Sequence, residues 1–301
     1  MRVRTHFPMA VALCAVLAAT AHAQMLRVLV TNDDGIGAPG IAALVDQLTL
    51  NPNLHVDVVA PATNQSGGSD NYSTNAFGVA AGTTATGYPG TAVSGTPADS
   101  VLYAIYTGLP QPPDVVVSGI NFGQNIGRYT VEDLSGTVGA AMTAARIGIP
   151  AIAVSAGLSA PDYGPAARYV ANVVEKLRTN KAFAKKMVSK TGLDQRLALN
   201  VNFPTCTTGA IRGVTVVPLA NAQDVLGRVV TGYTMTAPNT FKAVLSSTNA
   251  LASNCTSTLA DPTTDVEAMT NGFASVTPLN PTITPDSKWK KFKFLAKIPF
   301  N

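Results

Sequence analysis

The chain has 301 residues, of which 46% are hydrophobic and 13% charged, and its formal net charge is +4. This length and apolar content are enough for one large α/β domain, whereas the small net charge excludes the strongly basic surface with which proteins bind duplex nucleic acid. We therefore expect a single domain over residues 24–301 and no nucleic-acid duplex among its partners.

Residues 1–23 have the features of an export signal. Arg2 and Arg4 form a basic start, residues 9–19 are apolar but too short to span a bilayer, and Ala21-His22-Ala23 matches an A-x-A cleavage site. Cleavage would remove two of the 21 basic residues and leave 19 against 17 acidic ones, a net charge of +2. We predict an exported protein, periplasmic or secreted, without membrane attachment.

The first strand is predicted at residues 26–30, an apolar run that breaks at T-N-D-D-G before a helical spacing over residues 41–50. Asp33 and Asp34 therefore lie at the carboxyl end of a strand, the edge where open parallel sheets bind ligands. Adjacent like charges repel, and they share a crevice most easily when a cation lies between them. We interpret the pair as a metal site.

Two other interpretations fit the same residues. Asp and Gly are common in turns and helix caps, so D-D-G is also typical of an ordinary turn. Residues 35–40 match the dinucleotide pattern G-x-G-x-x-G, which would indicate an oxidoreductase. However, a pyrophosphate there would meet Asp33 and Asp34 where it needs N–H donors, and Asp57 lies inside the second strand, not at its end.

The second predicted strand, residues 56–60, leads into a long polar loop over residues 62–73, a kind of loop that is usually functional or mobile. A helix is expected over residues 101–106. Asp99 precedes it, and we favour a capping role for Asp99 over a catalytic one.

A third strand, residues 115–117, delivers Asn121 and Asn125 on a glycine-rich loop. Ser135-Gly136-Thr137 then opens a helix of small residues. The free N–H groups, the hydroxyl and the glycine at such a helix start suit an anion, although an ordinary N-cap would look the same.

The remaining elements complete the predicted fold. Buried strands are expected at residues 149–155 and 197–201, with an amphipathic helix at 165–177 between them. This alternation predicts a three-layer, doubly wound, Rossmann-like α/β fold with a mostly parallel sheet. The alternation is lost over residues 211–301, which we expect to form an antiparallel or extended region that packs on the sheet or serves as an oligomerisation arm. Within it we predict strands at 214–217, 228–235 and 274–277, and a helical turn at 265–269.

Cysteine and histidine counts limit the chemistry. Only Cys206 and Cys255 follow the signal, and an even number in an oxidising compartment predicts a disulfide between them. His55 is the one histidine beyond the signal, and no partner motif for a serine triad or a three-histidine zinc site accompanies it. Chemistry is therefore expected from Asp, Asn, Ser, Thr and backbone groups.

Six segments, in order over nearly the whole chain after the signal, resemble the SurE survival-protein family of metal-dependent nucleotidases and acid phosphatases. They are T-N-D-D-G-I-G-A-P-G-I (31–41), A-P-A-T-N-Q-S-G-G-S (60–69), S-G-T-P-A-D-S-V (94–101), S-G-I-N-F-G-Q-N-I-G (118–127), S-G-T-V-G-A-A-M (135–142) and T-D-V-E-A-M-T-N-G-F-A-S-V-T-P-L (264–279). The resemblance implies a divalent ion bound by Asp33, Asp34, Ser66 and Asn121.

The donor types agree with that implication. Carboxylate, hydroxyl and amide oxygens suit a hard cation, Mg²⁺ or Mn²⁺ with Ca²⁺ as a further possibility. The ion would activate a water for in-line attack on phosphorus, with Asp33 and Asp34 as the catalytic pair. The remaining phosphate oxygens are expected at a second set of residues: Asn125, Ser135, Gly136 and Thr137.

The expected substrate is a nucleoside 5′- or 3′-monophosphate or another small phosphomonoester. Tyr72 and Tyr129 lie on the two polar loops, and we hypothesise that they stack on a base. The resemblance also implies a homodimer or higher homo-oligomer formed through the C-terminal region. The main alternative from another class is a non-catalytic protein that binds metal or phosphate.

Overall fold

The computed structural model describes residues 25–158, 161–187, 197–221, 230–245, 252–280 and 289–301. The predicted export signal lies outside these residues and stays a prediction. Among the described helices, none has the length and apolar character needed to cross a membrane.

The core of the fold is a nine-stranded sheet with the order β3-β4-β2-β1-β5-β6-β7-β11-β8. Its strands are β1 (Leu26–Thr31), β2 (Leu54–Pro61), β3 (Val79–Thr83), β4 (Pro89–Val93), β5 (Val115–Phe122), β6 (Ala151–Ala156), β7 (Ala198–Phe203), β8 (Val214–Val216) and β11 (Ala274–Leu279). The six strands from β4 to β7 pair in parallel, and the antiparallel pairs are β3 with β4 and β7 with β11.

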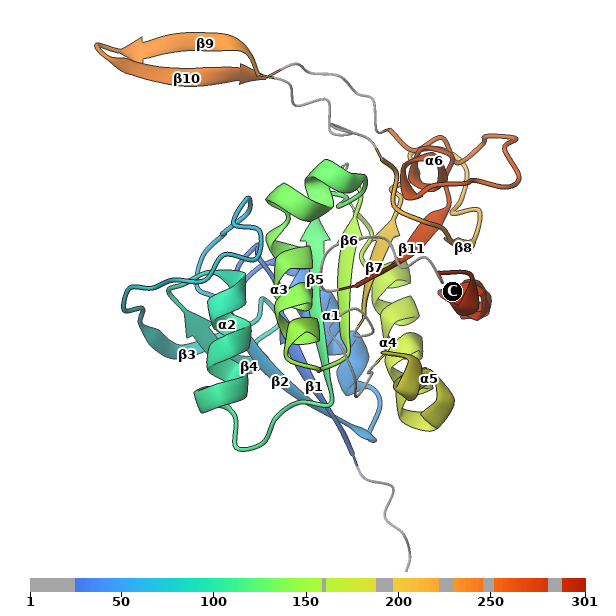
Figure 1. The fold of residues 1–301 in the computed structure, drawn as a ribbon, viewed down its shortest axis with the longest axis horizontal. Helices are drawn as coiled ribbons and strands as arrows, with labels where there is room; N and C mark the ends of the chain where they lie inside the picture. The colour runs from blue at the N-terminus through green and yellow to red at the C-terminus, as the bar shows by residue number, and fades with distance from the viewer. Residues whose placement is uncertain (1–24, 159–160, 188–196, 222–229, 246–251, 281–288) are drawn as a thin grey trace, which may run out of the picture.

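Helices cover both faces of this sheet (Figure 1). On one face, α1 (Pro39–Thr49) and α4 (Gly164–Thr179) share a core with Val28 and Val30 of β1. On the other face, α3 (Gly136–Arg146) packs with Leu29 of β1, and α2 (Pro97–Tyr103) lies beside α3. Alternate residues of β1 thus enter opposite cores, which is why the strand is a continuous apolar run in the sequence. The three-layer, doubly wound prediction is confirmed.

The C-terminal region differs from the prediction in one respect. β8 and β11 do not form a separate layer but extend the central sheet, with Val276 paired to Val201 of β7 on one side and to Val216 of β8 on the other. The predicted helical turn is confirmed as α6 (Asp265–Thr270). Two short helices flank these elements, α5 (Lys181–Met187) and the 3-10 helix η4 (Trp289–Lys297).

The antiparallel part is a hairpin of β9 (Val230–Ala237) and β10 (Thr240–Leu245), which extends away from the body of the molecule (Figure 1). The predicted strand 228–235 begins outside the described residues. Phe241 pairs with Met235, and Tyr233 lies two residues before Met235 on the same strand, so these three side chains share one face of the hairpin. The large side chains of that face, Tyr233, Met235 and Phe241, are exposed.

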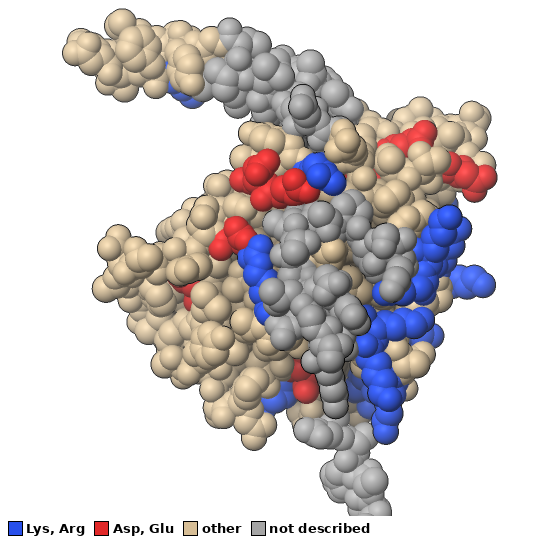
Figure 2. All heavy atoms as spheres, in the orientation of Figure 1, with Lys and Arg blue, Asp and Glu red and all other residues tan. Residues whose placement is uncertain are grey.

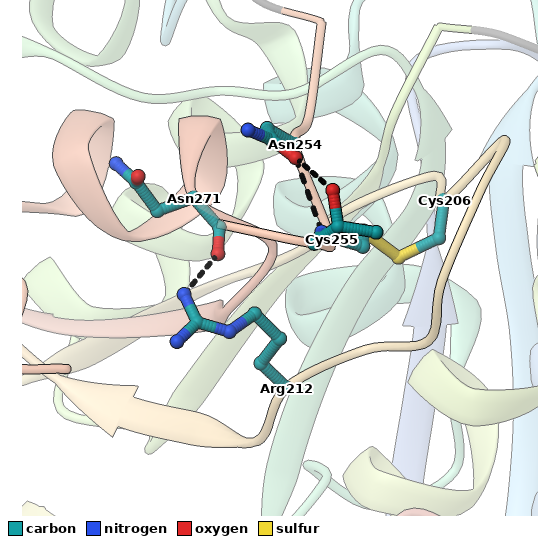
Figure 3. Close-up of a disulfide and its surroundings, with 6 residues drawn as sticks. Cys206, Arg212, Asn254, Cys255 and Asn271 are labelled. Carbon is teal, nitrogen blue, oxygen red and sulfur yellow. Dashed lines mark hydrogen bonds between the residues drawn. A yellow bond between two sulfur atoms is a disulfide. The ribbon is translucent and has the colours of Figure 1, made fainter. Parts of the chain in front are cut away.

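The predicted disulfide is present. Cys206 and Cys255 are bonded with their Cα atoms 5.7 Å apart, and the bridge joins the segment after β7 to the segment before α6 (Figure 3). Beside it, the Arg212 guanidinium donates to the carbonyl of Asn271 at 3.0 Å. The C-terminal segment is therefore fixed to the sheet both covalently and by hydrogen bonds.

β5 is longer than the sequence suggests. It continues through Gly119 to Phe122, so Asn121 lies at the end of a strand and not on a loop, which corrects the predicted strand 115–117. Gly119 has φ of +134°, and a Cβ there would lie 2.2 Å from the carbonyl oxygen of Val154. Only glycine fits this position, and it marks a register irregularity in the strand, not its end.

Candidate active site

A cavity of about 450 Å³ lies at the carboxyl ends of the parallel strands. Six of the residues predicted for the site line it: Asp33, Asp34, Ser66, Asn121, Asn125 and Ser135. The four proposed cation ligands therefore line the same cavity, although they come from three separate segments of the chain. Gly136 and Thr137, at the start of α3, do not line the cavity.

Asp33 is held from behind by the start of α3. The hydroxyl of Thr137 donates to its Oδ1 at 2.6 Å, and a Cβ on Gly136 would lie 2.9 Å from its Cβ. Burial raises the pKa of the Asp33 carboxyl to about 6; the bond from Thr137 opposes this shift and the charge of Asp34 adds to it. Gly136 and Thr137 therefore contact Asp33 instead of facing the cavity.

Asp34 is fixed by two donors. The backbone N–H of Phe122 donates to its Oδ2 at 2.9 Å, and the amide of Asn64 donates to its Oδ1 at 3.2 Å. Burial raises the pKa of Asp34, and the bond from Phe122 opposes the shift. Asn64 also accepts the N–H of Ser66 at 2.9 Å, so one side chain that the sequence analysis missed joins Asp34 to the Ser66 loop.

Asn121, at the end of β5, and Asn125, in the loop after it, are oriented differently. The Asn121 amide nitrogen donates to the carbonyl of Gly123 at 2.5 Å, which leaves its oxygen as the atom for a ligand. The Asn125 amide nitrogen donates to Ser155 Oγ at 2.8 Å and to Thr137 Oγ1 at 3.3 Å. A chain of hydrogen bonds thus runs from Asn125 through Thr137 to Asp33.

The survival protein SurE family model matches residues 28–225. The chain belongs to the SurE family. Relatives named 5′-nucleotidase SurE share 41% identity over 195 residues in Symbiobacterium thermophilum (64% of this chain and 71% of the relative) and 35% over 265 residues in Xylella fastidiosa (86% and 91%). A third, from Halobacterium salinarum, shares 39% over 255 residues, covering 84% of this chain and 90% of the relative.

Solved structures agree with the sequence match. The crystal structure of the SurE protein from Aquifex aeolicus superposes with a TM-score of 0.63 at 29% identity, covering 89% of this chain and 99% of that one. Most of the fold of this SurE-family chain is therefore shared with a solved relative.

Residues of β7 support the site of this SurE-family chain and were missed in the sequence. Asn125 donates its backbone N–H to Asn202 Oδ1 at 2.7 Å, and its carbonyl accepts the amides of Asn200 at 2.8 Å and Asn202 at 3.1 Å. Both β7 side chains are buried. The available indication was a pair of amides at alternate positions of the otherwise apolar run A-L-N-V-N-F.

Asp265 supports the same loop from α6. One carboxylate oxygen accepts the N–H of Gly127 at 2.8 Å and the other accepts the N–H of Ala220 at 2.7 Å. Burial raises the pKa of Asp265 to about 6, against the effect of these donors. Its sequence position indicated only a helix start, because its partner Gly127 is 138 residues away.

Four other residues singled out in the sequence have identifiable places. Ser135 caps α3 by accepting the N–H of Val138 at 3.0 Å, so it is an N-cap that also lines the cavity. Asp99 forms a capping box with Thr96, which confirms the capping prediction. Tyr72 and Tyr129 are exposed and do not line the cavity, so the stacking hypothesis finds no support in their positions.

The glycine pattern at residues 35–40 is explained by packing. Gly35 has φ of +103°, and a Cβ on Gly40 would lie 1.8 Å from the carbonyl oxygen of Ile120, so α1 approaches β5 as only glycine allows. Asp57 contacts Arg27 at 3.4 Å and His55 at 3.2 Å. Neither feature supports a dinucleotide site.

The cavity is lined by two carboxylates and, within the described part of the chain, by no lysine or arginine. Basic side chains gather elsewhere, notably around α5 and η4, as Figure 2 shows. The described residues contain no cluster of three or more His, Cys, Asp or Glu side chains, so a cation at this site would need amide or hydroxyl oxygens besides the two aspartates.

Proposed function

We propose that this SurE-family chain is a metal-dependent phosphomonoesterase that hydrolyses nucleoside 5′- or 3′-monophosphates to nucleoside and phosphate. One observation carries the proposal: Asp33, Asp34, Ser66 and Asn121, chosen from the sequence, line one cavity together with Asn125 and Ser135. Relatives named 5′-nucleotidase SurE support the substrate class.

The residues fit a divalent cation by the chemistry of their donor atoms. Two carboxylates, a hydroxyl and an amide oxygen make an all-oxygen set, which suits Mg²⁺ or Mn²⁺ and is compatible with Ca²⁺. No basic side chain among the lining residues balances the two acids. When bound, such an ion would polarise the phosphoryl group and lower the pKa of an attacking water.

The side chains of the chain itself contribute orientation and charge. Thr137 donates a hydrogen bond to one oxygen of Asp33, so the second oxygen of Asp33 remains for a ligand. The N–H of Phe122 likewise orients Asp34 through one of its oxygens. Gly136 and Thr137 contact Asp33 and position it from behind. We assign the phosphate to Asn125 and Ser135, which line the cavity next to the start of α3, where the helix dipole favours an anion. These donors would stabilise the charge that develops on phosphate oxygens in the transition state.

The test is a phosphatase assay on the purified chain. We expect release of phosphate from nucleoside monophosphates and from p-nitrophenyl phosphate, loss of activity with chelator, and recovery with Mg²⁺, Mn²⁺ or Ca²⁺ in an order that identifies the cation. If no phosphomonoester is hydrolysed with any of the three cations while the folded protein still binds one of them, the non-catalytic alternative replaces the proposal.

We also propose that the chain is exported and loses residues 1–23. The sequence of that segment supports this proposal, together with the disulfide between Cys206 and Cys255, which is typical of oxidising compartments. Mass spectrometry of the protein from a bacterial periplasmic fraction tests it, with Gln24 expected as the first residue.

We further propose a homodimer that uses the β9–β10 hairpin as its arm. Tyr233, Met235 and Phe241 form an exposed apolar face on an element that extends from the body (Figure 1). Light scattering should give twice the mass of the chain, and replacing these three side chains by serine should reduce it to the monomer mass.

A further inference from the structure

The cavity has a second set of lining residues that the proposed phosphate chemistry does not use. Three of them, Phe122, Leu134 and Leu158, are apolar. Phe122 is 49% exposed and Leu158 42% exposed. Leu158 lies against the loop after β5, since a Cβ on Gly123 would be 3.0 Å from its Cδ2. Apolar surface beside a polar reaction centre is typical of a site whose ligand has an apolar part.

Two polar side chains complete this second set. Gln124 is 4% exposed and Thr130 2% exposed, and both line the cavity. Neither Gln124 Oε1 nor Thr130 Oγ1 has a hydrogen-bond partner among the described residues. A buried polar atom without a partner costs about 1–3 kcal/mol, and native proteins keep few of them.

The location of these two atoms distinguishes them from other unpaired groups. Within the described residues, the remaining unpaired buried atoms belong to residues that do not line the cavity, such as Ser118 in β5 and Thr277 in β11. Among the residues that the structure describes, Gln124 and Thr130 are the two that both line the cavity and have an unpaired atom. Both atoms are shielded from solvent where they lie, so a ligand in the cavity would meet them after a rotation of either side chain toward it.

We propose that Gln124 and Thr130 hydrogen-bond the sugar hydroxyls of a nucleoside leaving group, while Phe122, Leu134 and Leu158 contact its base. Sugar hydroxyls both donate and accept, which matches an amide oxygen and a threonine hydroxyl. A base offers a flat apolar surface to an exposed aromatic ring. This inference rests on the proposed nucleotidase function and names the part of the substrate beyond its phosphate.

A neighbouring cavity offers a different place for the base, and the test must separate the two. It has about 490 Å³ and shares Asp34 and Phe122 with the first, but its other aromatic wall is Tyr163. The described residues that line it include neither Gln124 nor any atom from the unpaired set. The unpaired polar atoms therefore favour the first cavity.

Three substrates separate the proposed contacts to the sugar from those to the base. Adenosine 5′-monophosphate has sugar and base, ribose 5-phosphate has the sugar alone, and phenyl phosphate has an aromatic ring without sugar. For Q124L and T130V we expect KM to rise about fivefold to tenfold on the first two substrates, because each variant loses one hydrogen bond to the sugar. On phenyl phosphate, which has no sugar, KM should stay within about twofold of the wild-type value. For F122A we expect the rise on the first and third substrates but not on ribose 5-phosphate.

Two control variants complete the design. Q47L makes the same exchange on α1 outside both cavities, and Y163A removes the aromatic wall of the neighbouring cavity; both should leave all three KM values unchanged. Adenosine, which lacks phosphate, should inhibit phenyl phosphate hydrolysis by the wild type and about fivefold to tenfold less by Q124L. If Q124L does not fold, the KM values of T130V and the inhibition of the wild type by adenosine still test the inference.

The outcomes are distinct. An equal rise of KM on all three substrates for Q124L would assign that residue to the phosphate or to the fold, and unchanged values for both Q124L and T130V would also overturn the inference. An effect of Y163A on the nucleotide alone would place the nucleoside in the neighbouring cavity. If the wild type hydrolyses none of the three substrates, the proposed function itself fails, whatever the variants do.

Discussion

The two halves of the sheet contribute to the site in different ways. Strands β1, β2, β5 and β6 and the segments after them supply the residues that line the cavity, such as Asp34 and Asn121. Strand β7 and helix α6 supply none of the cavity lining but hold the loop after β5 through Asn200, Asn202 and Asp265. The first region lines the cavity of the proposed reaction, and the second holds the loop after β5 in place.

The loop between β5 and α3 stays in place without strand pairing of its own. Asn125 has both its backbone N–H and its carbonyl bonded to side chains of β7, and the N–H of Gly127 is bonded to α6. Buried amides therefore replace the ladder that a strand would provide. Variants in the two regions should differ in the size and the kind of their effects.

The largest effect is expected in the region that faces the cavity. D34N removes one charge from the proposed cation site, and we expect kcat/KM for phosphomonoesters to fall by roughly a thousandfold. D57N, on β2 and outside the cavity, is the matched control and should retain most activity. Titration of Mg²⁺ or Mn²⁺ by calorimetry should show weaker binding for D34N only; normal binding would remove Asp34 from the ligand set.

A smaller effect is expected from the supporting region. N202A removes one acceptor and one donor that position Asn125, and we expect kcat to fall by about 10–100-fold with the thermal unfolding still cooperative. N202D keeps the acceptor for the Asn125 N–H and should recover part of the rate, which a merely space-filling role would not explain. N172A, on the exposed side of α4, serves as the control.

The strands and site residues of the first region were predictable for one physical reason. Strands covered on both faces are continuous apolar runs, so the polar residues that end them, Asp33 and Asp34 above all, are conspicuous. The exception is β5, where Gly119 and Asn121 have the composition of a loop. Its continuation depends on a close contact with Val154, which no local pattern shows.

The supporting region could not be predicted in the same way. Asn200 and Asn202 alternate with apolar residues in a strand, as surface residues would, and their burial depends on the loop that crosses them. The places of β8 and β11 in the sheet likewise result from pairings between residues far apart in the chain. The periodicity of apolar residues indicates local structure and does not identify pairing partners that are distant in the sequence.

The supporting region also depends on its covalent link. Replacing Cys206 and Cys255 together by serine opens a loop of 49 residues, and the chain-entropy model predicts a loss of roughly 4 kcal/mol in the free energy of unfolding. Urea unfolding of oxidised wild type and the double variant measures the loss. Activity at low temperature should change little, because neither cysteine lines the cavity. A large loss of activity in folded protein would contradict the division between the two regions.

The smaller of the two stability effects is a pH dependence in the supporting region. Because the pKa of Asp265 is about 6 in the folded protein and 3.8 is its ordinary value, the folded state retains a proton between these values that the unfolded state has lost. Stability should therefore fall as the pH rises from about 4 to about 6, by up to roughly 3 kcal/mol, and then level off. Asp33 titrates in the same range, so the comparison of wild type with D265N in urea at several pH values isolates the contribution of Asp265. Since D265N has no carboxylate there to ionise, its free energy of unfolding should change less steeply with pH than that of the wild type. Equal pH slopes for the two proteins would mean that the three N–H donors keep Asp265 ionised throughout this range. In that case α6 holds the loop by charge as well as by hydrogen bonds.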